Sequence, residues 1–281
     1  MAEERGAPST LKGRLADVYV RALVEGSLNA LSRRLGNRAT IDDPLFGRAS
    51  TLSSIEPLLE KMANHFVAAG ATYRHVASTT GVDRDVSEGI LVMNPGAMGT
   101  GVMSPGVMNP GTHASAYGAA PPTASSGLTE LPIIVVAERR RLREIELRVY
   151  YASHSPQRRA RAPLLEAKAD VPVPQIVSHV LEALRKGAVE RVLAAFEETS
   201  RFVSPTGRSY TKRDGAMADF VDIIGGRIDV VPTGTADNGR TCCIEAIVTR
   251  RPPLEESEPA ALSFERGDSG LLRELRLYYE P

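Results

Sequence analysis

The stretch NRATIDDPLFG, residues 37–47, places two adjacent carboxylates, Asp42 and Asp43, at the end of a short extended segment and directly before a proline. Neighbouring residues of a strand point to opposite faces, so one of the two carboxylates must point into the protein. Burying a carboxylate is costly unless it is paired, hydrogen-bonded or protonated. Two explanations are open: an acid–base group in a pocket, or an aspartate that caps the turn after the strand.

Two further polar residues lie on predicted strands and could face a cavity. His75 shares a strand face with Tyr73 and Ala77, and if that face points inward it adds an imidazole to the site around Asp43. Glu245 also lies on a predicted strand, where it faces either a cavity in the second half of the chain or solvent. The five histidines show no close metal-ligand spacing, so we expect no metal site.

The composition narrows the classes of partner. The chain has 281 residues, 42% hydrophobic and 24% charged, with a net charge of zero. This balance gives no electrostatic reason to expect nucleic acid or an anionic membrane as a partner, and the mixed run RRLREIELR at 140–148 is typical of a solvated strand face. The sequence shows neither the apolar core of a signal peptide nor the roughly 18 apolar residues of a membrane span. Cys242 and Cys243 are predicted to be buried apolar residues of a strand, which favours a cytoplasmic location.

The sequence contains an internal repeat. ALVEGSLNAL begins at Ala22 and ALRKGAVERV begins at Ala183, an offset of 161. Near the ends of the two halves, ELRVYYAS and ELRLYYEP match at an offset of 128. The chain is therefore predicted to hold two copies of one fold, the first with 33 more residues than the second.

The additional residues of the first copy lie at 92–127, where Gly, Pro, Ala and Ser dominate and a Val-Met-x-Pro-Gly unit recurs. This composition is typical of a flexible loop. A loop of this length in a compact domain is expected to be either without fixed structure or a functional lid. A second polar stretch, 154–173, is predicted to link the two copies.

Each copy is predicted to consist of helices followed by an antiparallel sheet. In the first copy the helices end near Gly26, Leu35 and Gly70, and a capping box of Ser53 and Glu56 begins the last of them. Strands are expected to end at Asp43 and to span 71–79, 86–93, 131–138 and 142–153. In the second copy we expect helices at 174–185, 188–198 and 212–224, and strands at 200–204, 227–236 and 240–250 with two more to the C-terminus. This order predicts the α+β class.

The order of elements, with a strand that ends in ATIDDP and a sheet that ends in a Tyr-Tyr pair, resembles the nuclear transport factor 2-like superfamily. Ketosteroid isomerase and the SnoaL-type polyketide cyclases belong to this superfamily. The resemblance implies two tandem cone-shaped α+β barrels, at 11–153 and 174–281, each with a curved antiparallel sheet wrapped around N-terminal helices. It also implies that the two domains pack as a pseudo-dimer.

The segment IDDPLFG is similar to the strand end of ketosteroid isomerase, whose aspartate shuttles a proton, and this implies the same role for Asp43. Tyr19, 24 residues earlier, matches the tyrosine that hydrogen-bonds the developing oxyanion. The resemblance implies an apolar pocket with His75, Phe66 and Ile134 as substrate-binding residues. The expected partner is a hydrophobic, carbonyl-bearing small molecule of the polyketide or steroid kind. It would undergo isomerisation, cyclisation or dehydration in secondary metabolism, without a cofactor.

Two departures from the family pattern leave other functions open. The isomerase has a second aspartate near the position of Ile133 or Ile134, where this chain has no carboxyl. In the second copy, Tyr19 corresponds to Val180 and Asp43 to Ser204, so that copy is predicted to be catalytically degenerate. The alternatives are a non-catalytic ligand-binding or accessory protein of the same fold, and a polyether-type epoxide hydrolase or cyclase. The epoxide chemistry would require a second carboxylic acid that faces Asp43.

Overall fold

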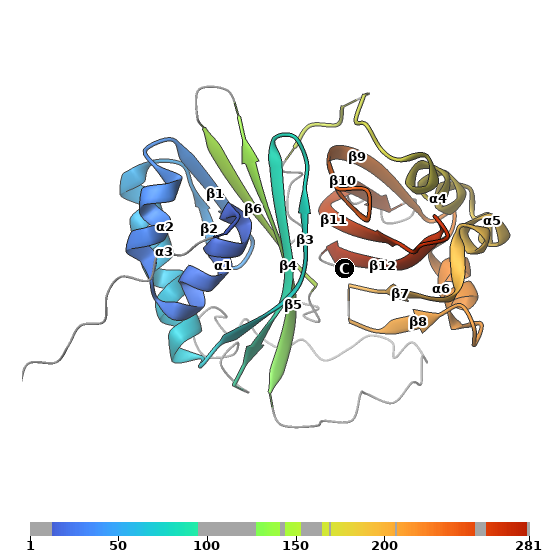
Figure 1. The fold of residues 1–281 in the computed structure, drawn as a ribbon, viewed down its shortest axis with the longest axis horizontal. Helices are drawn as coiled ribbons and strands as arrows, with labels where there is room; N and C mark the ends of the chain where they lie inside the picture. The colour runs from blue at the N-terminus through green and yellow to red at the C-terminus, as the bar shows by residue number, and fades with distance from the viewer. Residues whose placement is uncertain are drawn as a thin grey trace, which may run out of the picture.

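The computed structural model describes residues 13–94, 128–140, 144–152, 165–168, 170–205, 207–250 and 257–279. Two six-stranded sheets, one from each half of the chain, face each other in the middle of the molecule, and the helices of each half cover the outer side of its sheet (Figure 1). The predicted α+β class with two tandem sheet domains is therefore confirmed.

Domain 1 contains all the described elements up to residue 152. Its helices are α1 (Leu15–Glu25), α2 (Leu28–Leu35) and α3 (Leu52–Ala68). Its strands are β1 (Ala39–Asp43), β2 (Gly47–Ala49), β3 (Thr72–Thr80), β4 (Arg84–Met93), β5 (Thr129–Arg139) and β6 (Ile145–Tyr151). The strand order is β2-β1-β6-β5-β4-β3, in which β1 is parallel to β6 and the other pairs are antiparallel. The parallel pair places the end of β1, which carries Asp43, beside β6.

Domain 2 repeats this arrangement. Its helices are α4 (Gln175–Lys186), α5 (Val189–Ala194) and α6 (Ala216–Ile224). Its strands are β7 (Phe196–Val203), β8 (Ser209–Thr211), β9 (Ile228–Asp237), β10 (Thr241–Arg250), β11 (Ser257–Arg266) and β12 (Leu272–Tyr279). The strand order is β8-β7-β12-β11-β10-β9, with β7 parallel to β12. The short strands β2 and β8 are the described elements that the sequence did not predict.

The first helix of each domain ends at a glycine because the backbone there turns left-handed. Gly26 after α1 has a φ of 68°, and Gly187 after α4 has a φ of 67°. A residue with a Cβ is strained in this conformation, which is why glycine is favoured at such helix ends. The break that the sequence predicts near Gly26 is therefore confirmed, together with its repeat in domain 2.

Helix α3 begins at a different cap from the predicted one. Thr51 is the N-cap residue, and its backbone N–H donates to the Ser54 hydroxyl at 3.1 Å. The Thr51 and Ser54 side chains complete the reciprocal capping box. The predicted box of Ser53 and Glu56 is wrong because the chain is still extended at Thr51, which puts Ser54 at the third helical position.

The two faces of each sheet have different neighbours. On β5, Ile133 and Val135 pack in the core against the helices of domain 1, whereas Ile134 and Val136 belong to a cluster that also contains residues of domain 2. This cluster between the domains comprises Val86, Ile134, Val136, Tyr150, Ala152, Ala236, Cys243, Ala261 and Tyr278. The two similar sheet domains thus fit a pseudo-dimer arrangement, with the sheets in contact and the helices outside (Figure 1).

Three predictions about individual segments have different outcomes. The run at 140–148 is not simply a solvated strand face, because Arg148 is only 1% exposed and lies between the domains. Cys242 and Cys243 are free, buried strand residues, as predicted. Strand β4 extends through Met93, and the rest of the predicted loop at 92–127, from residue 95 on, lies outside the described residues, as does most of the predicted linker at 154–173.

Candidate functional site

The two adjacent aspartates of β1 point to opposite sides, as strand geometry requires. Asp43 is 1% exposed, while Asp42 is partly exposed and lies 4.0 Å from Arg48 on β2. Asp43 is paired with Gly47 across the tight β1–β2 hairpin. The inward carboxylate expected from the sequence is therefore Asp43, at the point where β1 turns into β2.

Hydrogen bonds hold both carboxylate oxygens of Asp43. Its Oδ1 accepts the backbone N–H of Leu45 at 2.8 Å and that of Phe46 at 3.2 Å. Its Oδ2 accepts the hydroxyl of Tyr151 at 2.9 Å. Asp43 therefore caps the turn after β1, which is the structural explanation for its position. It is also buried beside the Tyr151 phenol, which is compatible with the alternative explanation of an acid–base group.

Tyr19 is fully buried on α1, and its hydroxyl has only a weak acceptor. Within the described residues, this hydroxyl donates to the sulfur of Met62 on α3, at 3.6 Å. A thioether is a weak acceptor, so this phenol is poorly satisfied compared with most buried hydroxyls. Burial raises the pKa of Tyr19 well above 10, and the charge of Asp43 raises it further. The two residues are therefore close enough to interact electrostatically.

Phe66 lies in the same core as Tyr19 and Asp43. Its ring packs edge-on against Phe46 and His65, with ring centres 5.6 Å apart in both pairs. Burial lowers the pKa of His65, which favours the neutral imidazole. The structure thus brings Phe66, Tyr19 and Asp43 together on the helical side of the sheet.

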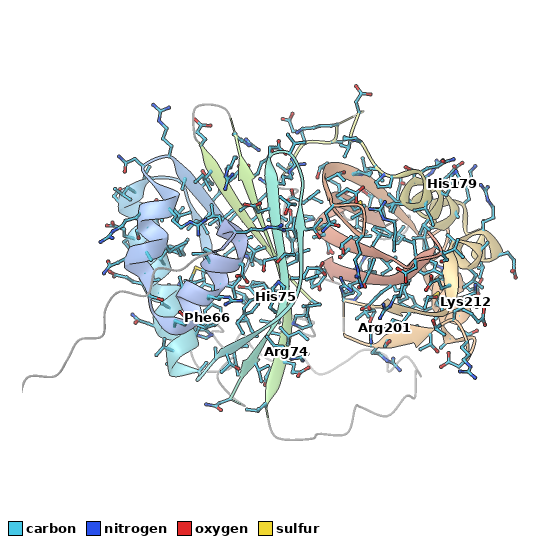
Figure 2. The ribbon with its side chains drawn as sticks, in the orientation of Figure 1. Phe66, Arg74, His75, His179, Arg201 and Lys212 are labelled. Carbon is cyan, nitrogen blue, oxygen red and sulfur yellow. The ribbon has the colours of Figure 1, made fainter. Side chains whose placement is uncertain are left out.

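The structure places the other two predicted pocket residues elsewhere. His75 is exposed on β3, where its Nε2 lies 2.8 Å from the hydroxyl of Ser78 (Figure 2). His75 stays on the face of Tyr73, with ring centres 6.4 Å apart, but on an edge strand of the sheet. The bulge between His75 and Ala77 moves Ala77, not His75, to the face toward domain 2. Ile134 is buried but faces domain 2, on the opposite side of the sheet from Phe66.

Sequence reasoning did not identify Tyr151, the side chain that donates to Asp43. The Tyr150-Tyr151 pair was used to align the two copies and as part of the family resemblance, and neither tyrosine was assigned to the site. Because β6 alternates, Tyr151 faces the helices and Asp43, whereas Tyr150 faces domain 2 and donates to Glu245 at 2.7 Å. The signal was the strand alternation at the end of β6, next to the strand that carries Asp43.

Glu245 faces neither solvent nor a cavity of domain 2, so both sequence-based explanations for it are wrong. It is 2% exposed and accepts hydrogen bonds from Arg148 and Tyr150 of domain 1. Burial alone would raise the pKa of Glu245, but Arg148 and Arg84 outweigh it and hold the pKa below its ordinary value. Glu245 does point away from the helices of domain 2, as strand alternation allows. The outer face of that sheet is covered by domain 1 and not by solvent.

Among the described residues of domain 2, the positions that correspond to Tyr19 and Asp43 carry neither a tyrosine nor a carboxylate. The positions of Tyr19 and Asp43 are taken by Val180 and Ser204, and both are buried. A cavity of about 430 Å³ opens on the helical side of domain 2. His179, which lines it, lies on α4 (Figure 2). It is lined by Gln175, Ile176, His179, Arg191, Ala194, Ala195 and Leu271. Its polar residues differ from those around Asp43, so the two places are chemically distinct.

No helix among the described residues is both long and apolar enough to cross a membrane. Within the same residues, His, Cys, Asp and Glu side chains form no group of three or more that could hold a metal ion.

No family model and no curated protein matches the sequence. Solved structures similar to this chain include an NTF2-like protein of unknown function from Cytophaga hutchinsonii, with 16% identity, a TM-score of 0.33, and coverage of 41% of this chain and 95% of that one. The epoxide hydrolase/cyclase-like enzyme SalBIII has 15% identity, a TM-score of 0.34 and coverage of 38% and 88%. The Anabaena orange carotenoid protein, solved with canthaxanthin, has 15% identity, a TM-score of 0.35 and coverage of 43% and 42%. Each match spans about one domain of this chain, and the likeness concerns the fold only.

Proposed function

We propose that domain 1 binds a small hydrophobic molecule through a carbonyl oxygen and that Asp43 moves a proton on the carbon chain beside that carbonyl. The observation that carries this proposal is the Tyr19 hydroxyl, a buried donor whose acceptor is the Met62 sulfur at 3.6 Å. A ligand oxygen would be a stronger acceptor than a thioether. Replacing the Met62 sulfur by a ligand oxygen as the acceptor of the Tyr19 hydroxyl would therefore favour binding in this core.

Met62 is the side chain that the ligand would displace. It is fully buried and lies against the Tyr19 hydroxyl. Methionine has three rotatable bonds and adapts readily to a new shape. A ligand that pushes Met62 aside would place its carbonyl oxygen at Tyr19 and its ring system among apolar side chains such as Phe66.

Asp43 is the base of the proposed reaction. Its carboxylate would take a proton from the carbon next to the carbonyl, the resulting enolate oxygen would accept a hydrogen bond from Tyr19, and Asp43 would return the proton to another carbon. Each carboxylate oxygen has two lone pairs, so Oδ2 can receive a proton while Tyr151 still donates to it. An isomerisation, a cyclisation or a dehydration can each begin with this step, and none of them requires a cofactor.

A second candidate function is binding without catalysis, which the turn-capping role of Asp43 favours. Both of its oxygens already accept hydrogen bonds from the protein. A carboxylate held in this way is well suited to a structural role. Epoxide chemistry would require a second carboxylic acid that faces Asp43. The other buried carboxylates of domain 1 are already engaged: Glu88 accepts from Arg276 of domain 2, and Glu138 accepts from Arg148.

The test uses two probes, β-naphthol for binding and a bicyclic enone for proton transfer. The chain has no tryptophan, so naphthol emission can be followed without tryptophan background. Tyr19→Phe should weaken naphthol binding by about tenfold or more, the usual range for a lost hydrogen bond in a buried site. The exposed His75→Ala variant is the control and should bind as wild type does.

Proton transfer is measured as deuterium uptake by the enone in D₂O, read by proton NMR. We expect uptake with wild type and none with Asp43→Asn, which should still bind naphthol. Tyr19-dependent binding without any Asp43-dependent uptake would favour the non-catalytic function. Binding that is absent, or that does not depend on Tyr19, would contradict both candidates.

A further inference from the structure

Two reciprocal arginine–glutamate ion pairs connect the two sheets across the boundary between the domains. From domain 1, Arg148 donates to Glu245 at 2.6 and 2.7 Å. From domain 2, Arg276 donates to Glu88 at 2.8 and 3.2 Å. All four side chains are buried, so loss of a partner in the other domain would be costly for each, although Arg148 and Arg276 also contact glutamates of their own domains.

The two ion pairs involve equivalent positions of the repeat. Glu88 on β4 lies in the same cross-strand row as Tyr150 on β6, and Glu245 on β10 lies in the same row as Tyr278 on β12. Each tyrosine donates to the glutamate of the other domain, Tyr150 at 2.7 Å and Tyr278 at 3.1 Å. The face that each sheet presents to the other domain therefore carries one glutamate and one Arg-x-Tyr sequence. If only these groups mattered, a second copy of domain 1 could dock on domain 1 as well as domain 2 does.

The edge strands of the two sheets are equivalent as well. Ala77 on β3 pairs with Glu88, and Gly234 on β9 pairs with Glu245. A bulge adjoins the pair in both domains. Ala77 and Gly234 therefore occupy the same position of the repeat, one with a Cβ and one without.

Arg84 breaks this equivalence. Its guanidinium lies against Gly234, where an added Cβ would be 2.5 Å from Cζ and 2.8 Å from Nη2. The same side chain donates to Glu138 at 3.0 Å, and its Nε lies 3.7 Å from Glu245, so two carboxylates fix its place. The repeat has Thr241 where domain 1 has Arg84, so this contact occurs in one direction only.

We propose that Arg84 and Gly234 form a specificity pair, which lets the sheet face of domain 1 accept domain 2 of its own chain and reject a second copy of domain 1. A second domain 1 would present Ala77 where domain 2 presents Gly234. The Cβ of Ala77 would occupy the place of the guanidinium, and Arg84 would lose its position between the carboxylates. A steric and electrostatic penalty against the wrong partner is a common source of specificity.

The chain has a built-in reporter for this interface. Cys243 lies between the two sheets, whereas its neighbour Cys242 lies in the core of domain 2. In a Cys242→Ala background, the rate at which a thiol reagent labels Cys243 under native conditions reports opening of the interface. We expect Gly234→Ala and Arg84→Ala each to increase that rate by about tenfold or more. The double variant should label no faster than the faster single variant.

Two controls separate this inference from general destabilisation. In a Cys243→Ala background, Cys242 reports unfolding of domain 2, and its labelling should not respond to Gly234→Ala. Ala77→Gly changes the equivalent position of domain 1, where the repeat of Arg84 is Thr241, and should leave Cys243 labelling as it is. The proposal would be overturned if the increases in the Cys243 labelling rate caused by Gly234→Ala and Arg84→Ala multiplied in the double variant. It would also be overturned if Gly234→Ala raised the Cys242 labelling rate by a similar factor.

The rejection of a second copy is tested by light scattering. Glu245→Arg repels Arg84 and Arg148 and so weakens the pairing within one chain. Adding Ala77→Gly makes room for Arg84 of another copy, so the double variant should form more dimer than Glu245→Arg alone. Equal dimer fractions would overturn the proposed role of the missing Cβ.

Discussion

Asp43 and Tyr19 are two buried polar residues whose surroundings suit different tasks. Among the described residues, two backbone N–H groups and the Tyr151 hydroxyl donate to the Asp43 carboxylate, whereas the Tyr19 hydroxyl donates to the Met62 sulfur. A group with good partners is costly to remove, and a group with a poor partner gains when a better one arrives. At the residue scale this contrast indicates a fixed position for Asp43 and supports the proposed ligand recognition by Tyr19.

The two tyrosines near Asp43 should therefore differ in their effect on stability. Tyr151→Phe removes a donor to a buried carboxylate and should lower the free energy of unfolding by about 1–3 kcal/mol. Tyr19→Phe removes only a contact with sulfur and should change it by less than about 0.5 kcal/mol. Urea unfolding of both variants measures the difference. A larger loss for Tyr19→Phe than for Tyr151→Phe would show that Tyr19 has a structural partner.

Substitutions of Asp43 separate its capping role from its charge. Asp43→Asn keeps an oxygen that can accept the N–H groups of Leu45 and Phe46, so it should stay within about 1 kcal/mol of wild type. Asp43→Ala removes the oxygens that accept from those donors and from the Tyr151 hydroxyl and should cost about 3 kcal/mol or more. The comparison is again made by urea unfolding. Equal losses in the two variants would contradict the capping geometry.

At the scale of elements, the cap of α3 gives a direct prediction. Thr51→Ala removes the N-cap side chain and should lower the free energy of unfolding by about 1 kcal/mol. Glu56→Ala is the matched control, because Glu56 is exposed and belongs to the box that the sequence predicted wrongly. Its effect should be near zero. If the order of the two effects were reversed, helix α3 would begin at Ser53.

The sequence predicted most helices and strands because their apolar spacing is strong and occurs twice. Alternation also predicted that one aspartate of the pair points inward, and the resemblance to ketosteroid isomerase implied that it is Asp43. Alternation cannot reveal a bulge, so Ala77 was assigned to the wrong face, and it cannot reveal exposure at a sheet edge, so His75 was assigned to a pocket. Nor can it reveal what covers the outer face of a sheet, so the surroundings of Ile134 and Glu245 were missed. The Asp43–Tyr151 contact depends on two strands 108 residues apart becoming neighbours, and local patterns do not encode that pairing.

At the scale of the whole molecule, the charges between the domains should make stability depend on pH. Burial would raise the pKa values of Glu245 and Glu138, but the arginines around them hold both below the ordinary 4.5. A lowered folded-state pKa stabilises the protein above the unfolded value, and this contribution is lost as the pH falls through the folded-state value. We expect the unfolding midpoint to be steady from pH 7 to about 5 and to fall below about 4.5.

Glu245→Gln tests the origin of this dependence. It leaves Arg148 and Arg84 facing a neutral group, so it should destabilise the protein most at neutral pH and least in acid. Glu182→Gln, in an exposed pair with Lys186, is the matched control and should have little effect at any pH. A constant difference between Glu245→Gln and wild type across the pH range would contradict the assignment.

The most direct test of the central claim is to observe the Tyr19 phenol itself while a ligand binds. The chain is labelled with tyrosine carrying ¹³C at Cζ, the Tyr19 signal is assigned with Tyr19→Phe, and a bicyclic enone is titrated in. The account predicts that the Tyr19 signal shifts saturably as its hydroxyl leaves the Met62 sulfur for the ligand oxygen. A ligand that binds without shifting that signal, or no binding at all, would contradict the claim that Tyr19 is the recognition group of domain 1.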